Sequence, residues 1–248
     1  MAFDTQRGTW TRAQAEAAEI DVGLRQYMLR VYNYMASGLA LTGLVAALVA
    51  GSPVLNAVFF QIGMRGTLQP TGLGWLAIVA PLGLVFAFSF GMARMRASTA
   101  QGLFWLYAGL MGVSMSTLFA VYTGASITRV FFIAAASFCG LSLWGYTTRR
   151  NLSAFGTFLV MGLIGLVVAS LVNMFLASSA LHFVITVAGV GIFAGLTAWD
   201  TQKIKDMYWV GDDGEIAGKK AVMGALTLYL DFINLFIMLL RLMGDRRQ

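Results

Sequence analysis

The sequence has few charged residues for its length. Only 11% of its 248 residues are charged and 58% are hydrophobic, whereas a soluble domain has about 25% charged residues. The chain is therefore predicted to be an integral membrane protein. Its single cysteine, Cys139, has no disulfide partner and belongs to no metal-ligand spacing. Residues 1–30 carry charges but no apolar core, so we do not expect a cleavable signal peptide there.

The basic residues follow a pattern that does not indicate nucleic-acid binding. The net charge is +6, but Lys and Arg occur as singles and pairs between apolar runs. A basic stripe interleaved with exposed aromatic residues, which is typical of a nucleic-acid interface, is missing from the sequence. Membrane topology explains this pattern better, because cytoplasmic loops are rich in Lys and Arg. We expect a lipid bilayer, and no nucleic acid, as the partner of the chain.

Long uncharged runs predict an all-α polytopic membrane protein with seven transmembrane helices. A bilayer core of about 30 Å takes about 20 helical residues. Four of the runs therefore hold one helix each, and the run Asn151–Trp199 holds two that divide near Ser178. The short gap around Arg129 predicts that the third and fourth helices form a tight antiparallel hairpin. The predicted helices are 31–50, 73–93, 100–121, 127–147, 153–176, 181–203 and 221–242.

The distribution of Lys and Arg predicts a cytoplasmic N-terminus. Twelve of the 17 basic residues fall on the side of the N-terminus, as the positive-inside rule expects. Three arginines near the C-terminus conflict with this bias, so the seventh segment either crosses fully or dips in and returns. We divide the chain into a cytoplasmic N-terminal segment (1–30) with an interfacial helix over 15–29, a transmembrane domain (31–243) and a tail (244–248).

Two aspartates, Asp200 and Asp231, lie within or against membrane-length segments. An ionised carboxylate at the bilayer centre costs about 3 kcal/mol, so such a residue indicates a functional site. Helical spacing puts polar residues beside each acid on the same helix. These are Thr197 and Thr201 near Asp200, and Thr227 and Asn234 near Asp231.

The sixth and seventh segments are consecutive and antiparallel, so the two carboxyl groups are expected to meet. Two carboxyl groups in a site of low dielectric constant cannot both ionise cheaply, so they would titrate as one coupled unit. We interpret the pair as a proton-sensitive latch between the two helices. The alternative is that each acid separately bonds a hydroxyl or a basic residue. Arg94 and Arg96 reach the same leaflet, and Arg94 is favoured as the partner because it is closer to the apolar run.

Three stretches resemble the bacterial branch of the Bax inhibitor-1 family, also called the transmembrane Bax inhibitor motif family. They are G-L-R-Q-Y-M-L-R-V-Y-N-Y-M-A (Gly23–Ala36), F-A-G-L-T-A-W-D-T-Q-K-I-K (Phe193–Lys205) and L-Y-L-D-F-I-N-L-F (Leu228–Phe236). The resemblance implies a seven-helix protein of the bacterial inner membrane whose last helix lies at the centre of the bundle. It also implies a pH-sensitive calcium leak channel, with Asp200 and Asp231 as the latch and an arginine from the second helix.

Three functional classes follow from the residues and the resemblance. The leading hypothesis is a cation leak, in which calcium is the permeant ion, Asp200 and Asp231 are transient ligands, and no cofactor is needed. The alternative is a non-conducting regulator of a partner such as a membrane-bound protease. An intramembrane aspartyl protease is disfavoured because neither acid stands in G-x-G-D, so we do not expect an enzyme. The acidic cluster over 212–215 lacks the calcium-loop pattern and is expected to be a solvated loop.

Overall fold

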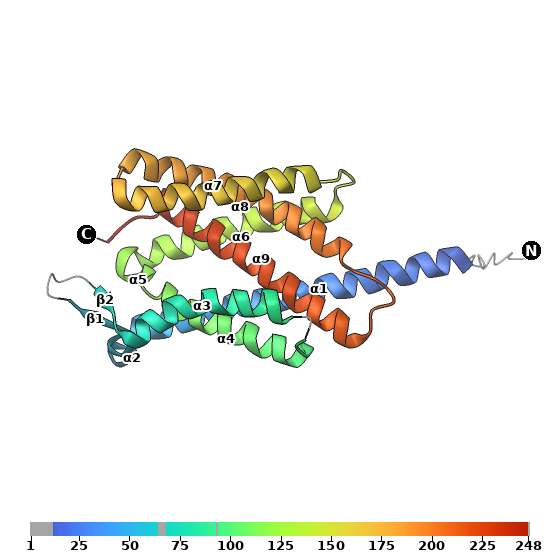
Figure 1. Cartoon of the computed structure of the whole chain (residues 1–248), viewed down its shortest axis with the longest axis horizontal. Helices are drawn as coiled ribbons and strands as arrows, with labels where there is room; N and C mark the ends of the chain where they lie inside the picture. Colours follow the sequence, from blue (N-terminus) through green and yellow to red (C-terminus); the bar gives the residue numbers. More distant parts are fainter. Residues whose placement is uncertain (1–11, 64–67, 93, 248) are drawn as a thin grey trace, which may run out of the picture.

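The computed structural model describes residues 12–63, 68–92 and 94–247. The beginning of the predicted N-terminal segment (1–11) and the last residue of the predicted tail (248) lie outside the described residues. The described part is mainly helical, with one short β-hairpin (Figure 1). Its elements are α1 (Arg12–Gly51), α2 (Pro53–Phe59), β1 (Phe60–Ile62), β2 (Leu68–Pro70), α3 (Gly72–Gly91), α4 (Ala97–Met115), α5 (Leu118–Val121), α6 (Gly124–Thr147), α7 (Ser153–Leu176), α8 (Ser179–Asp206) and α9 (Gly214–Met243).

Within the described ranges, seven helical segments are long and apolar enough to cross a membrane. They are Val22–Gly51, Gly72–Gly91, Ala97–Val121, Gly124–Thr147, Ser153–Leu176, Ser179–Asp206 and Gly214–Met243. Each overlaps one of the predicted segments, so the prediction of an all-α protein with seven such helices is confirmed. The β-hairpin between α2 and α3 was not predicted, because its strands have only three residues each.

Polar residues set where several of these helices begin. Thr71, Thr123, Ser178 and Asp213 precede α3, α6, α8 and α9, and the side chain of each accepts a hydrogen bond from a backbone N–H in the first turn. Such N-caps satisfy donors that have no partner within the helix. The predicted division of the long apolar run near Ser178 is therefore confirmed, and its cause is a local capping signal.

The last helix, α9, lies between two groups of helices. One group contains α1, α3 and α4, the other contains α6, α7 and α8, and α9 packs against α1, α4, α6 and α8 (Figure 1). Within an apolar stretch of 18 residues in each helix, 72% of the stretch in α9 is buried inside the bundle, compared with 11% of the stretch in α7. The expectation that the last helix is central is confirmed.

The predicted hairpin of the third and fourth membrane segments is wrong. The connection between α5 and α6 is short, as expected, but α4 packs on α1, α3 and α9 and does not lie along α6. The reason is that α9 lies between the two groups, so two segments that are adjacent in sequence face different neighbours.

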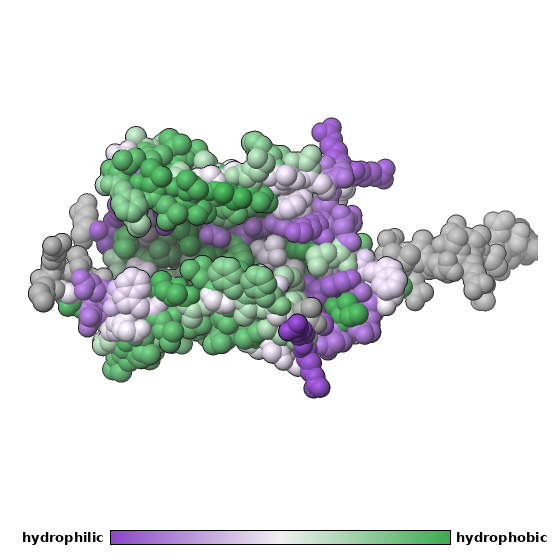
Figure 2. Space-filling model, in the orientation of Figure 1, coloured by the Kyte–Doolittle hydropathy of each residue, from purple (hydrophilic) through white to green (hydrophobic). Residues whose placement is uncertain are grey.

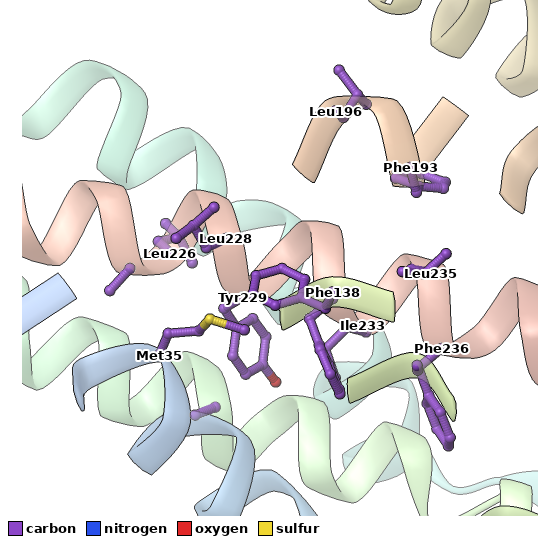
Figure 3. Close-up of a cluster of buried hydrophobic side chains, with 14 of the residues drawn as sticks. Met35, Phe138, Phe193, Leu196, Leu226, Leu228, Tyr229, Ile233, Leu235 and Phe236 are labelled. Carbon is purple, nitrogen blue, oxygen red and sulfur yellow. The ribbon is translucent and has the colours of Figure 1, made fainter. Parts of the chain in front are cut away.

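Tyr229 of α9 joins three helices in the core. Its ring meets the rings of Phe104 and Tyr107 of α4 edge to face, with centroid distances of 6.0 and 5.6 Å. Its hydroxyl lies 2.7 Å from Oγ1 of Thr42 in α1. Because Thr42 donates its own proton to the carbonyl of Ala108, Tyr229 is the donor. Figure 3 shows Tyr229 in a cluster that also contains side chains from α1, α6 and α8, namely Met35, Phe138 and Phe193.

The two ends of the described chain lie at opposite ends of the bundle (Figure 1). The tail is held at the end where α6 begins, since the N–H of Thr123 donates to the carbonyl of Asp245 and the N–H of Asp245 donates to Ser126 Oγ. Arg129 forms an ion pair of 2.8 Å with Asp245. The seventh segment therefore passes along the whole bundle, and the re-entrant alternative is excluded.

The first helix is a single rod. It runs without a break from Arg12 to Gly51, so the predicted interfacial helix over 15–29 is continuous with the first membrane segment. Tyr27 and Met28 are buried in the main core, which shows that the end of this segment packs against the bundle. Its placement on the membrane surface stays a prediction.

Close packing of α6 on α8 depends on Gly145, and this gives a first test. A Cβ atom at Gly145 would overlap the carbonyl group of Ala198, whereas a Cβ atom at Gly140, on the same helix, would meet nothing within 4 Å. Overpacking costs about 1–3 kcal/mol, and Gly to Ala in an exposed helix gains about 1 kcal/mol. We expect Gly145→Ala to lower the Tm of the purified protein, and Gly140→Ala to leave it unchanged or raise it. Equal Tm shifts in the two variants would contradict this packing.

Candidate functional site

The structure brings Asp200 and Asp231 together. Asp200 lies in the last third of α8 and Asp231 near the middle of α9, and they are only 6% and 5% exposed. Their carboxyl groups lie close enough to interact with each other electrostatically. An ionised carboxyl group only accepts hydrogen bonds, so the two groups can bond to each other only when one of them carries a proton. The site is therefore a pair of neighbouring, buried carboxyl groups.

Thr197 and Thr201 lie beside Asp200 but bond to their own helix. Both side chains are fully buried. Thr197 Oγ1 donates to the carbonyl of Phe193 at 2.8 Å, and Thr201 Oγ1 donates to the carbonyl of Thr197 at 2.7 Å. Each hydroxyl group therefore donates its hydrogen bond to the backbone and not to an aspartate. The two threonines form a polar wall beside Asp200, made of their two hydroxyl groups.

A chain of hydroxyl groups connects this wall to α1 and α6. Ser142 Oγ lies 2.9 Å from Thr201 Oγ1 and 2.5 Å from the hydroxyl of Tyr32. Thr201 uses its proton on a carbonyl, so Ser142 must donate to Thr201 and Tyr32 must donate to Ser142. Tyr32 and Ser142 were not predicted as part of the site, because the only sign of either in the sequence is a polar atom in an apolar run.

The polar face predicted for α9 is divided in two. Asp231 is buried against α8, whereas Thr227 and Asn234 lie on a half-exposed stripe of the helix. Thr227 Oγ1 donates to the carbonyl of Met223 at 3.1 Å, and Asn234 Nδ2 donates to that of Leu230 at 2.8 Å. The stripe consists of Met223, Thr227, Leu230, Asn234 and Ile237, at helical spacing.

Arg94 is not bonded to the acids within the described part of the chain. It follows α3, and its side chain is exposed, as is that of Arg96. The cation whose charge acts on both carboxyl groups is instead Lys203, one turn after Asp200 on α8. Lys203 Nζ also lies 5.0 Å from the centre of the Trp199 ring. A role for Arg94 in the latch stays a prediction.

The pair offers too few oxygens for a tight calcium site. A bound Ca²⁺ typically has about six to eight oxygen ligands. In the ranges that the structure describes, no three His, Cys, Asp or Glu residues lie together in a way that could hold a metal ion. Asp231 Oδ2 is buried and has no hydrogen-bond partner among the described residues. The role of the two acids as transient calcium ligands stays a prediction.

The acidic residues before α9 hold the loop in place. Asp212 pairs with Lys220 at 2.6 Å, and its side chain is only 8% exposed. Asp213 caps α9, and Glu215 accepts a hydrogen bond from the backbone N–H of Ala97 at the start of α4. The expectation of a solvated loop is therefore wrong for Asp212, because the loop folds back on α9.

Comparison with known proteins agrees with this architecture. A family model described as "Inhibitor of apoptosis-promoting Bax1" matches residues 24–248. The chain belongs to the Bax inhibitor-1 family. The resemblance to this family that the sequence indicated is thereby confirmed.

Several bacterial relatives match almost their whole length. The inner membrane protein YbhL of Escherichia coli is 46% identical over 227 residues, which cover 91% of this chain and 94% of YbhL. An uncharacterized protein of Rickettsia prowazekii is 50% identical over 227 residues, 92% of each chain. An uncharacterized protein of Caulobacter vibrioides is 41% identical over 248 residues, 99% of each chain. This member of the Bax inhibitor-1 family is an integral membrane protein.

The contact between the acids makes a prediction for stability at neutral pH. In Asp200→Asn the amide can still donate to the carboxylate of Asp231, whereas in Asp200→Ala that buried carboxylate loses its partner. An unsatisfied buried polar group costs about 1–3 kcal/mol or more. We expect Asp200→Ala to lower the Tm clearly and Asp200→Asn to keep it close to the wild type. If both variants unfold at the wild-type temperature, the acids do not depend on each other.

Proposed function

We propose that this protein is a pH-sensitive cation leak channel, with calcium as the permeant ion and the Asp200–Asp231 pair as its gate. The observation that supports the proposal is the close approach of two buried carboxyl groups on α8 and α9. A buried acid in a membrane segment is costly unless it has a partner, and here the partner is a second acid. Only a proton makes that partnership favourable.

Loss of the shared proton would change the contact strongly. Two unit charges 4 Å apart repel each other by about 4 kcal/mol at an effective dielectric constant of 20. Asp231 belongs to the helix that contacts both groups of the bundle. Repulsion between the acids would therefore act on the packing of α9 against α8, and a change of pH would make or break the latch.

The half-exposed stripe of α9 is our candidate for the ion path. The side-chain oxygens of Thr227 and Asn234 lie on this stripe, and carboxyl oxygens lie beside it at Asp231. Figure 2 shows a hollow between the two groups of helices, with hydrophilic residues among the hydrophobic ones along it. Oxygen ligands suit a hard cation such as Ca²⁺. Because polar groups are sparse here, we expect slow conduction.

We further propose that the protein lies in the bacterial inner membrane with its N-terminus in the cytoplasm. The relative YbhL is named as an inner membrane protein, and the excess of Lys and Arg is on the N-terminal side. In this orientation the carboxyl pair and Lys203 lie toward the cytoplasm. The β-hairpin and the tail lie on the opposite side.

Calcium flux into proteoliposomes across a pH series tests the proposal. We expect flux in the wild type that changes with pH, and a flattened pH response in Asp200→Asn and Asp231→Asn, because an amide cannot gain or lose the proton. Asp206→Asn is the matched control, since Asp206 is an exposed acid on the same helix. It should keep the wild-type pH profile.

Two outcomes would argue against the proposal. A pH response that survives in both aspartate variants would show that the pair is not the gate. The absence of any flux from well-folded protein would favour the alternative, a non-conducting regulator that acts on a partner such as a membrane-bound protease.

A further inference from the structure

A second site lies at the end of the bundle where the tail is held, away from the two acids. It is a cavity of about 870 Å³ between the end of α1, α2, β1, the α4–α5 region and the tail. Pockets for small molecules have typical volumes of about 300–1,000 Å³. One part of its wall is made of small apolar residues, Ala47, Ala50 and Ala57, and its polar groups include Asn56 and Arg247.

The tail fixes the direction in which Arg247 points. The N–H of Arg247 donates to the carbonyl of Val121 at 2.9 Å, and Arg246 forms a β-bridge with Tyr122. Successive side chains of an extended chain point to opposite sides. Accordingly Arg247 lines the cavity and the neighbouring Arg246 does not. The structure therefore offers two adjacent arginines of which one belongs to the site.

The charge around the cavity favours an anion. The described segments that meet at this end, residues 50–63, 68–72, 116–129, 176–183 and 240–247, contain a single acidic residue, Asp245. That residue is already paired with Arg129 at 2.8 Å. Arg247 is thus not opposed by a second acid in these segments, and a guanidinium group matches the geometry of a phosphate with two parallel hydrogen bonds.

We propose that this cavity binds an amphiphilic phosphate. The guanidinium group of Arg247 holds the phosphate, the amides of Asn56 and Gln61 are further donors, and the apolar part of the ligand lies on the alanine wall. The phosphate comes either from the headgroup of a phospholipid or from a soluble organic phosphate. Binding here does not depend on ion conduction or on the carboxyl pair.

Thermal unfolding of the full-length protein in non-ionic detergent micelles tests this site and its ligand source. One arm adds glycerol 3-phosphate, and the other compares phosphatidylglycerol with phosphatidylcholine at equal mole fractions. Ligand at about 100 times its Kd is expected to raise the Tm by about 5 °C or more. A shift with glycerol 3-phosphate but not with phosphatidylglycerol identifies a soluble ligand. A shift with phosphatidylglycerol, and with neither glycerol 3-phosphate nor phosphatidylcholine, identifies a lipid.

Matched variants make the test specific. Arg247→Gln should abolish the shift, whereas Arg246→Gln, which removes the same charge one residue earlier, should keep it. Ala57→Phe should also abolish the shift by filling the cavity while all arginines remain. The proposal is overturned if neither phosphate raises the Tm, if the shift persists in Arg247→Gln, or if Arg246→Gln loses it equally.

Discussion

The burial of α9 on most of its sides is the constraint on which the rest of the structure depends. A polar group inside such a bundle needs a partner from a neighbouring helix or from its own backbone. Tyr229 donates a hydrogen bond to Thr42 of α1, and Thr227 donates one to a backbone carbonyl of α9. Asp231 lies beside Asp200 of α8. The central helix is therefore connected to each side of the bundle by different chemistry: an aromatic and hydroxyl contact toward α1 and α4, and a carboxyl contact toward α8.

The sequence was sufficient for features that are local. Hydropathy predicts the membrane segments, because each helix must satisfy its own backbone hydrogen bonds within the bilayer. Ser178 marks the start of α8, because its side chain accepts a hydrogen bond from the N–H of Leu181, three residues later. Asp200 and Asp231 were found because a charge in an apolar run is conspicuous. The features that were missed depend on neighbours distant in sequence: the packing of α4 away from α6, the hydroxyl chain from Tyr32, and the fold of Asp212 back onto Lys220.

Charge is distributed unequally along the bundle, and this bears on both proposals. The carboxyl pair lies in one half, whereas the opposite end carries arginines and only one acid. A cation that approaches that end meets a positive potential, which disfavours its passage. A phosphate bound beside Arg247 would offset part of that potential. If both proposals hold, ligand binding in this cavity would influence the access of cations from the same end of the protein.

The two ends of α9 are fastened to different partners. At its start, Glu215 accepts the backbone N–H of Ala97 on α4, and beyond its end Asp245 is bound to Ser126 and Arg129 of α6. A helix held at both ends cannot shift along its axis without losing the contacts at one end, but it can still rotate about its axis or bend in the middle. Asp231 lies in that middle stretch, so in the proposed gate the two acids would separate most easily through a small rotation of the middle of α9 that leaves the contacts at both ends intact.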